Sequence, residues 1–553
     1  MTTAPPLPDD VRRYRDARAR IEQLPLPDSL PALLDQAVLQ WPDRPAVNFF
    51  ELERGRLSFR ELRDASLAVA ELLSDLGVEP GDHVMVALPN IPIFPVTWLA
   101  LARLKAVMVP ANDRYTASEF AFVISDSEPV VIVTAHELAP TIADALGATA
   151  VKAHVVTTAS DATLALDIAG ISHEVSAPAQ SERAFPESQA DDRVGIHYTS
   201  GTTGFPKGCI LTHRTWLIAA AVSLHMLPSP PHRILSDAPY FYIDAPAETA
   251  LALMSGAEQY IAGRASLSKF VRRLSDLDID YVEVWEALAD EVLDPEAEAS
   301  LRSRGTVLHA SSFGLRDSRR ADVEERLHAV VREMFGMTEI GFGTLVPYDV
   351  DVAPHGTCGL AAPYRETRIV DPETGEDLDD GAVGELWVRG PGVMLGYHRR
   401  PEVNKELLKP DGWFRTGDLM RRDALGFHFM VGRIKDMIRR SHENISAREV
   451  EEALQSIPGV LSAAVVGVPN PMRGEEVKAF IVLDPAHREE LSPEVIVEKA
   501  ADSLARFKLP RYIEFVAELP LTPSGKVAKA ELRRRDEGAT PRGWDQSVQE
   551  WRP

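Results

Sequence analysis

Residues 196–213 read IHYTSGTTGFPKGCILTH, an apolar strand end that runs into a loop of Ser, Thr and Gly and then into an apolar segment. Glycine permits positive φ and close backbone approach, and the N–H groups of such a loop form an anion-binding nest. The residues expected to cradle a polyphosphate are Thr199, Ser200, Gly201, Thr202, Thr203, Gly204 and Lys207. The loop is not a Walker A loop, because the chain contains no GxxxxGK[ST].

Outward from this loop, apolar runs alternate between helical and strand patterns. The N-terminal part predicts helices over 58–77, with Ser58 as N-cap, and over 98–106. It predicts strands over 81–90, 107–111 and 129–135. Strand, helix and strand at this spacing indicate an α/β sheet.

The composition and the spacing of apolar residues change along the rest of the chain. Residues 155–192, rich in Ala, Ser and Asp, predict in part a linker, whereas 234–345 again alternate strands with helices. Short apolar runs with glycine turns over 356–398 are typical of an antiparallel or barrel-like subdomain. A compact α+β pattern follows, with helices over 446–456 and 492–505 and strands over 460–469, 477–483 and 512–519.

We therefore predict an α/β protein with two domains. Residues 1–432 form a large N-terminal domain of stacked α/β sheets with a small β-barrel-like subdomain. Residues 433–536 form a small α+β domain, and 537–553 form a flexible tail. The length of 553 residues is ample for several cores.

The amino-acid composition and net charge exclude several classes of function. Lys and Arg number 59 and Asp and Glu 83, a formal net charge of −24, which disfavours nucleic acid and anionic membranes as partners. The two cysteines have no CxxC spacing and predict free thiols in a reducing compartment. No signal sequence and no run of 18 apolar residues is present, so we expect a cytoplasmic protein without a membrane span.

Four further motifs accompany the loop in a fixed order. They are FGMTE (335–339), WFRTGD (413–418), GRIKDMIRR (432–440) and PLTPSGKVAKAEL (520–532). Together with the loop they resemble the adenylate-forming superfamily of acyl-CoA synthetases, adenylation domains and luciferases. The resemblance covers about residues 30–535.

The resemblance implies a role for each motif. It implies catalytic roles for Lys526, Thr338 and Lys207, and Mg²⁺ ligation by Glu339 with Thr199. It implies that Phe335, with Gly336 and Met337, flanks adenine, that Asp418 binds the ribose, and that Arg433 contacts the nucleotide. It makes Lys435 and Asp436 the pivot about which a mobile C-terminal domain rotates.

The resemblance also implies a two-step reaction that uses ATP and Mg²⁺. An acid oxyanion attacks the α-phosphorus of ATP, which gives an AMP anhydride and pyrophosphate. The small domain then rotates, and a second nucleophile displaces AMP.

The segment after the pivot departs from the family pattern. It reads RRSHENIS (439–446), so His442 stands where the family has a glycine that lines the tunnel for the pantetheine arm of CoA. An imidazole partly fills such a passage. The use of CoA as a cofactor therefore stays open.

A second set of departures falls in the expected substrate pocket. Polar or aromatic side chains replace apolar and glycine-rich segments there, and the pocket residues we expect are Tyr242, Asp244, Glu283, Trp285, Ser312 and Gly314. Unpaired polar groups in a pocket are costly around a fatty acyl tail. A small polar or aromatic substrate with amine or hydroxyl groups fits them better.

Three hypotheses remain. The sequence favours a CoA-independent ligase with an amine acceptor, such as an amide-forming ligase or an ATP-dependent diazotase that passes adenylated nitrite to an aryl amine. The alternatives are an acyl-CoA or aryl-CoA synthetase, for which FYIDA (241–245) suggests the carnitine-CoA ligase branch, and a silent nucleotide-binding protein. The expected partners are a small-molecule acid and an amine or thiol acceptor, and the oligomeric state stays undetermined.

Overall fold

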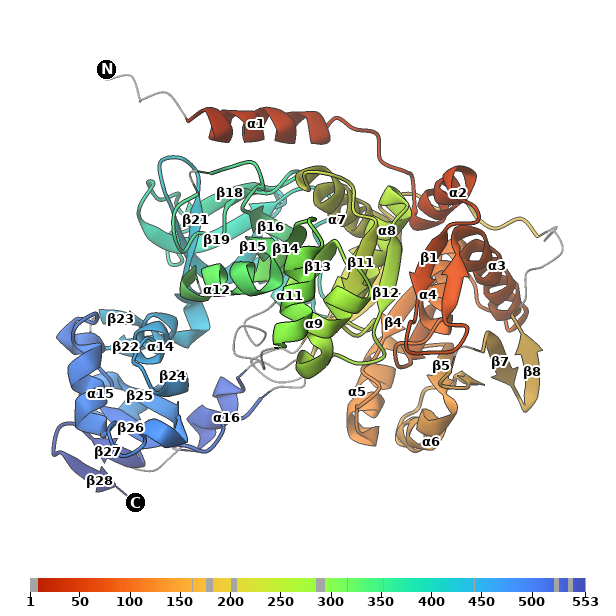
Figure 1. Cartoon of the computed structure of the whole chain (residues 1–553). Helices are drawn as coiled ribbons and strands as arrows, with labels where there is room; N and C mark the ends of the chain where they lie inside the picture. The colour runs from red at the N-terminus through yellow and green to blue at the C-terminus, as the bar shows by residue number, and fades with distance from the viewer. Residues whose placement is uncertain are drawn as a thin grey trace.

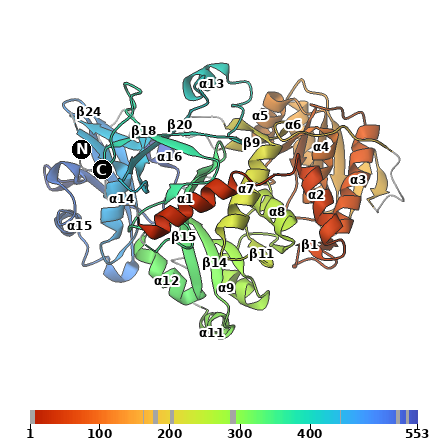
Figure 2. The same cartoon turned by 90° about the horizontal axis from the view of Figure 1, so that it is seen from above.

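The structure of this chain is a computed structural model. It describes residues 8–161, 163–175, 183–199, 206–284, 294–315, 317–351, 353–441, 443–521, 527–535 and 541–552. These residues form four sheets with helices against them, and Figure 1 shows the blue C-terminal elements gathered to one side of the rest. Helix α1 (Asp9–Ile21) crosses over the middle of the molecule (Figure 2), where the Tyr14 hydroxyl donates to the Ala361 carbonyl at 2.7 Å.

An eight-stranded sheet carries the 196–213 motif at one edge, in the order β10-β9-β4-β3-β5-β6-β7-β8. Its central strands pair in parallel and are buried apolar runs, which is typical of a sheet covered on both faces. The strands are β3 (His83–Ala87), β4 (Val107–Pro110), β5 (Val131–Ala135), β6 (His154–Thr158), β7 (Ala165–Ile168), β8 (Ile171–Glu174), β9 (Arg193–Thr199) and β10 (Lys207–Thr212). The helices of this part are α3 (Phe59–Asp75), α4 (Ile93–Leu104), α5 (Ala117–Ser127), α6 (Ala139–Gly147) and α7 (His213–Met226).

The N-terminal predictions agree with this sheet. All three expected strands are present, and α3 begins after Ser58, which forms a capping box with Glu61. The helix expected over 98–106 begins earlier, at Ile93, because Pro92 fits the N-cap position and the following residues are apolar on all sides.

A nine-stranded sheet contains the FGMTE motif and has the order β17-β16-β15-β14-β13-β11-β12-β1-β2. Its strands are β1 (Pro45–Asn48), β2 (Arg56–Ser58), β11 (Arg233–Ser236), β12 (Glu258–Ile261), β13 (Tyr281–Val284), β14 (Leu308–Phe313), β15 (Ala329–Met337), β16 (Gly341–Leu345) and β17 (Leu360–Ala361). Its helices are α2 (Leu30–Gln40), α8 (Asp244–Ser255), α9 (Leu267–Asp276), α11 (Pro295–Ser303) and α12 (Asp317–Leu327). One large core cluster joins it to the eight-stranded sheet.

The third sheet is antiparallel, in the order β18-β19-β20-β21. It consists of β18 (Glu366–Val370), β19 (Val383–Arg389), β20 (Phe414–Arg422) and β21 (His428–Arg433), with α13 (Pro401–Leu407) between β19 and β20. The antiparallel subdomain expected from the 356–398 segment thus has four strands, and WFRTGD lies at the start of β20.

The fourth sheet belongs to the C-terminal part and has its own core. Its strands are β22 (Met437–Arg440), β23 (Glu443–Ser446), β24 (Val460–Asn470), β25 (Gly474–Leu483), β26 (Tyr512–Phe515), β27 (Gly543–Asp545) and β28 (Glu550–Arg552). The helices are α14 (Ala447–Gln455), α15 (Pro493–Ala500) and α16 (Lys529–Arg534). Sheets change between Arg433 and Met437, and the exact division of the chain at 432/433 stays a prediction.

Two sequence expectations are wrong where the structure describes them. Within 155–192, which we expected to be partly a linker, β6, β7 and β8 extend the first sheet, because Val156 and Leu166 provide enough apolar side chain for edge strands. The expected flexible tail instead forms β27 and β28. Trp544 is buried in the C-terminal core, and β27 pairs with β26.

In the part of the chain that the structure describes, no helix is both long and apolar enough to span a bilayer.

Candidate active site

The loop of the 196–213 motif is bounded by an antiparallel strand pair. Thr199 ends β9 opposite Lys207 at the start of β10, and the Thr199 hydroxyl donates to the Lys207 carbonyl at 3.4 Å. The loop residues Ser200, Gly201, Thr202, Thr203 and Gly204 lie outside the described residues, as does Lys526 of the C-terminal motif. Their expected roles stay predictions.

Lys207 and Glu339 approach the same tyrosine, which the sequence analysis did not single out. The Lys207 ammonium lies 5.2 Å from the centre of the Tyr397 ring. The Tyr397 hydroxyl donates to Glu339 Oε1 at 2.6 Å, and Glu339 is buried. A cation over an aromatic face is attracted to it. The Tyr397 side chain therefore contacts the Lys207 cation with its ring face and the Glu339 carboxylate with its hydroxyl.

Both cysteines are buried, and one of them lies in this group. Burial raises the pKa of Cys209 well above its ordinary value, and the negative charge of Glu339 raises it further. Burial also raises the pKa of Cys358, to about 11. The structure has both as free thiols, as the sequence predicts, and both are protonated at neutral pH.

The FGMTE motif runs from the end of β15 into the following turn. Gly336 is required there, because a Cβ atom would lie 2.6 Å from the Gly341 carbonyl oxygen of the paired strand. Phe335 is largely buried, and its expected contact with adenine stays a prediction. Met337 ends β15, and half-buried Thr338 opens the turn that leads to Glu339.

Asp418 and Arg433 face each other on β20 and β21. The Arg433 Nε donates to Asp418 Oδ1 at 2.9 Å. Asp418 Oδ2 is buried and has no hydrogen-bond partner among the described residues. Burial raises the Asp418 pKa, although Arg433 opposes the shift. A buried acceptor with no donor is costly unless a ligand supplies one, so this atom fits the hydroxyl of a bound sugar.

The pivot residues lie in the 3₁₀ turn that follows Arg433. Asp436 accepts from Arg533 of α16 at 2.7 Å. Burial lowers the Lys435 pKa to about 8, and the nearby Arg433 charge acts in the same direction. The turn between the third and fourth sheets is therefore tied to the C-terminal helix by an ion pair.

The expected substrate-pocket residues separate into two groups on opposite faces of the nine-stranded sheet. Glu283 pairs in register with Ser311, whereas Ser312 pairs with Val284 and with Glu333. Side chains alternate between the faces of a sheet, so Glu283 and Ser312 do not line one cavity wall. Trp285 lies outside the described residues.

The first group is acidic. Asp244 begins α8, Glu248 follows one turn later, and Glu283 lies on β13. Burial raises the pKa of Glu248 and of Glu283 well above the ordinary value, and each is raised further by a neighbouring carboxylate. The Glu248 carboxylate accepts from the Ser236 hydroxyl. Burial and the charge of Asp244 also raise the Tyr242 pKa.

The second group is organised by Glu333, which the sequence analysis missed. Its carboxylate accepts from the Ser312 hydroxyl and from the Gly314 N–H, both at 2.5 Å. Burial raises the Glu333 pKa to about 7. The sequence signal for Glu333 was its position two residues before FGMTE. The signal for Glu248 was its position one helical turn after Asp244. Tyr397 offered none, because only the fold brings it to Glu339.

The described residues contain no group of three or more His, Cys, Asp or Glu side chains that could hold a metal ion by themselves. Glu339 is a single hard oxygen ligand. Such a site fits Mg²⁺, which protein sites usually bind through one or two carboxylates together with phosphate oxygens and water.

Comparison with known proteins follows the same motifs. Residues 34–398 match the AMP-binding enzyme family, and 449–526 match the AMP-binding enzyme C-terminal domain. The chain is 32% identical to a sulfoacetate–CoA ligase of Cupriavidus necator over 91% of this chain and 97% of that protein. It is 31% identical to a crotonobetaine/carnitine–CoA ligase of a Proteus species over 89% and 96%.

Solved structures agree with this placement. ATP-bound MatB from Rhodopseudomonas palustris is similar with a TM-score of 0.81 and 26% identity, covering 92% of this chain and 99% of that one. The large domain of several sheets and the separate C-terminal sheet are thus the architecture of this family. The chain belongs to the AMP-binding enzyme family, and it is an adenylate-forming ligase.

Proposed function

We propose that this ligase uses ATP and Mg²⁺ to convert a small polar acid into an AMP anhydride, and that it passes the activated group to an amine. The observation that carries the first half is Asp418, whose buried Oδ2 has no donor among the described residues while Arg433 donates to Oδ1. A ribose hydroxyl would supply that donor. The similarity to an ATP-bound structure supports the same assignment.

The residues around Glu339 support the phosphate side of the proposal. Lys207 provides a cation at the start of β10, and Tyr397 orients the Glu339 carboxylate through a hydrogen bond of 2.6 Å. Mg²⁺ bound with the phosphates would neutralise charge that develops during transfer. Fixed charges of this kind need no reorganisation at the moment of reaction, which is the main source of catalytic effect in such sites. Lys526 is expected to hold the attacking oxyanion.

The acidic group at α8 and β13 supports a substrate that carries an amine. Among the described residues, the neighbouring charges that shift the pKa of Glu248 and of Glu283 all belong to carboxylates. Buried carboxylates without a cation are costly. An ammonium or amine group would satisfy them, whereas an acyl chain would leave them unpaired.

His442 supports the amine acceptor over CoA, because a side chain stands where the family has a tunnel-lining glycine. CoA remains the second candidate acceptor, and the relatives favour it, since the similar curated proteins named above are CoA ligases.

The experiment measures pyrophosphate release from ATP and Mg²⁺ across carboxylic acids and nitrite, each with and without CoA and aryl amines. We expect release that depends on a small polar acid, and turnover that rises with an amine. Formation of a thioester with loss of free thiol would show that the amine acceptor is wrong. A His442→Gly variant that gains CoA activity would support the tunnel argument, and a Lys526→Ala variant tests for adenylation by the enzyme itself.

A further inference from the structure

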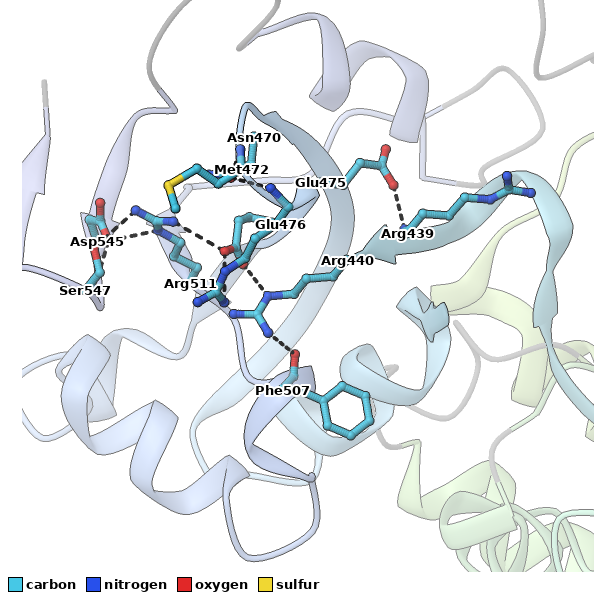
Figure 3. Close-up of polar contacts among 11 residues, drawn as sticks. Arg439, Arg440, Asn470, Met472, Glu475, Glu476, Phe507, Arg511, Asp545 and Ser547 are labelled. Atoms are coloured by element: carbon cyan, nitrogen blue, oxygen red, sulfur yellow. Dashed lines mark hydrogen bonds and ion pairs between the residues drawn. The ribbon is translucent and has the colours of Figure 1, made fainter. Parts of the chain in front are cut away.

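Strands β22 and β23 lie on either side of positions 441 and 442, and we call residues 437–441 and 443–446 the acceptor hairpin. This hairpin is fastened to the β24–β25 turn by its backbone. The Ser441 N–H donates to the Arg473 carbonyl at 2.7 Å, and the Arg439 N–H donates to Glu475 Oε2 at 2.7 Å. Figure 3 shows the Arg439–Glu475 contact beside a second set of side chains.

That second set centres on Glu476, whose side chain is buried. The Arg440 Nε donates to Glu476 Oε2 at 2.6 Å, and Arg511 approaches Glu476 Oε1 at 3.3 Å (Figure 3). Arg473 also approaches Glu476 Oε1, at 3.4 Å. One carboxylate is thus surrounded by three guanidinium groups. Charge-assisted hydrogen bonds of this kind are stronger than neutral ones and fix geometry.

The C-terminal strand pair joins the same network. The Arg511 Nε lies 3.4 Å from Asp545 Oδ1, and its Nη2 donates to the Ser547 hydroxyl at 3.2 Å. The Gln546 N–H donates to the Arg511 carbonyl at 2.9 Å. A continuous path of polar contacts therefore runs from β27 through Arg511 and Glu476 to Arg440, the last residue of β22 before Ser441 (Figure 3).

We infer that Glu476 is a positioning residue for the transfer step, because it holds the acceptor hairpin in place through Arg440, and that β27 supports it through Arg511. His442 itself lies outside the described residues. The inference rests on the proposed role of the acceptor hairpin in transfer. The contacts named for this network include no nucleotide-site residue. Loosening it should therefore affect transfer and leave adenylation intact.

The test compares Glu476→Gln, Arg440→Ala and Asp545→Asn in the full chain. Glu452→Gln is the matched control, because Glu452 forms an exposed ion pair of 2.7 Å with Arg448 on α14, in the same C-terminal part and outside the network. ATP–pyrophosphate exchange reports adenylation. A single-turnover reaction of the preformed adenylate with acceptor reports transfer. Amide hydrogen exchange over residues 437–446 reports the hairpin directly.

We expect Glu476→Gln and Arg440→Ala to slow transfer roughly tenfold or more, since small misplacements near reacting groups are costly. Pyrophosphate exchange should stay within about twofold of the native enzyme, and the amides of 437–446 should exchange faster. Asp545→Asn should act in the same direction more weakly, and Arg440→Lys should restore part of the loss. The control should change neither step.

Two results would overturn the inference. One is equal loss in both half-reactions, which would mean general damage to the domain. The other is unchanged amide exchange over 437–446 in Glu476→Gln. If the native enzyme transfers to CoA and not to amines, the proposed acceptor is wrong, and the variants are compared with CoA instead. If it transfers to neither, hydrogen exchange alone decides.

Discussion

The carboxylates of the proposed nucleotide site and those of the proposed substrate group have different surroundings. In the nucleotide site, Glu339 is bonded to Tyr397 and Asp418 to Arg433. In the acidic group, the charge of Glu283 raises the pKa of Glu248 and the charge of Asp244 raises that of Glu283, and no basic side chain of the described residues forms an ion pair with Glu248 or Glu283. The first region is arranged for a reaction common to the family. The proposed substrate group has no counter-charge among the described residues, so we expect it to determine which substrate binds.

The largest expected effect concerns the nucleotide site. Asp418→Ala should lower ATP–pyrophosphate exchange roughly 100-fold, because it removes a charge-assisted acceptor and leaves Arg433 unpaired. The matched control is Asp380→Ala, which breaks an exposed ion pair with Arg422 on the same sheet and should change little. Exchange at the native rate in Asp418→Ala would remove the basis for placing the ribose there.

Glu333 lies on β15, two residues before the FGMTE motif, and its raised pKa predicts a dependence of stability on pH. Its pKa is about 7 in the folded protein against 4.5 for an unperturbed side chain. The folded state therefore binds the proton more tightly, and its contribution to the free energy of unfolding falls as pH rises from about 4.5 to 7. The Glu333→Gln variant has no carboxyl group at this position, so its free energy of unfolding does not fall in this way. We expect its unfolding free energy at about pH 8 to exceed that of the native protein by on the order of 2 kcal/mol, once solvent screening is allowed for.

Urea denaturation of the native protein and Glu333→Gln at about pH 5 and about pH 8 measures this difference. At the lower pH the two proteins should be nearly equal, because most of the folded carboxyl is then protonated. A difference that is the same at both pH values would contradict the raised pKa.

Glu283→Gln addresses the acidic group itself. Without this charge, the KM for an amine-bearing substrate should rise roughly tenfold, while pyrophosphate exchange with a substrate that lacks the amine should be unchanged or faster. The control is Glu296→Gln, which alters an exposed carboxylate on α11. If KM rises equally for substrates with and without an amine, Glu283 shapes the pocket and does not bind the amine.

The smallest expected effect is that of Ser58→Ala. Because Ser58 lies outside both regions, this variant shows what a loss of stability alone does to activity. Ser58→Ala removes the N-cap of α3 and half of its capping box, and should cost about 1 kcal/mol of unfolding free energy. Pyrophosphate exchange under native conditions should not change. A drop in activity would show that stability losses alone can imitate the effects assigned to the site variants.

The sequence predicted the parts that depend on local pattern. Apolar runs identified β3, β4 and β5, and the capping residues identified the start of α3. The motifs pointed to Lys207, Glu339, Asp418 and Arg433 because each motif is a short contiguous stretch, and the roles of these residues stay predictions. The ion pair of Asp418 with Arg433 follows from strand pairing and confirms that these two motifs meet.

The sequence could not predict what depends on register and on distant contacts. Glu283 and Ser312 were grouped as one pocket, but a one-residue offset between strands places them on opposite faces. Tyr397 reaches Glu339 only through tertiary packing. The C-terminal strands looked like a polar tail because a single buried tryptophan, Trp544, is enough to anchor so short an element.

Because both cysteines are buried, the native enzyme contributes little background to an assay for free sulfhydryls. Cys209 and Cys358 account for both cysteines in the sequence, and neither is accessible in the folded state. A colorimetric reagent for free sulfhydryls, added to native enzyme, should therefore register coenzyme almost exclusively. The choice between thioester and amide products can be followed in real time on wild-type protein, without engineering any residue away.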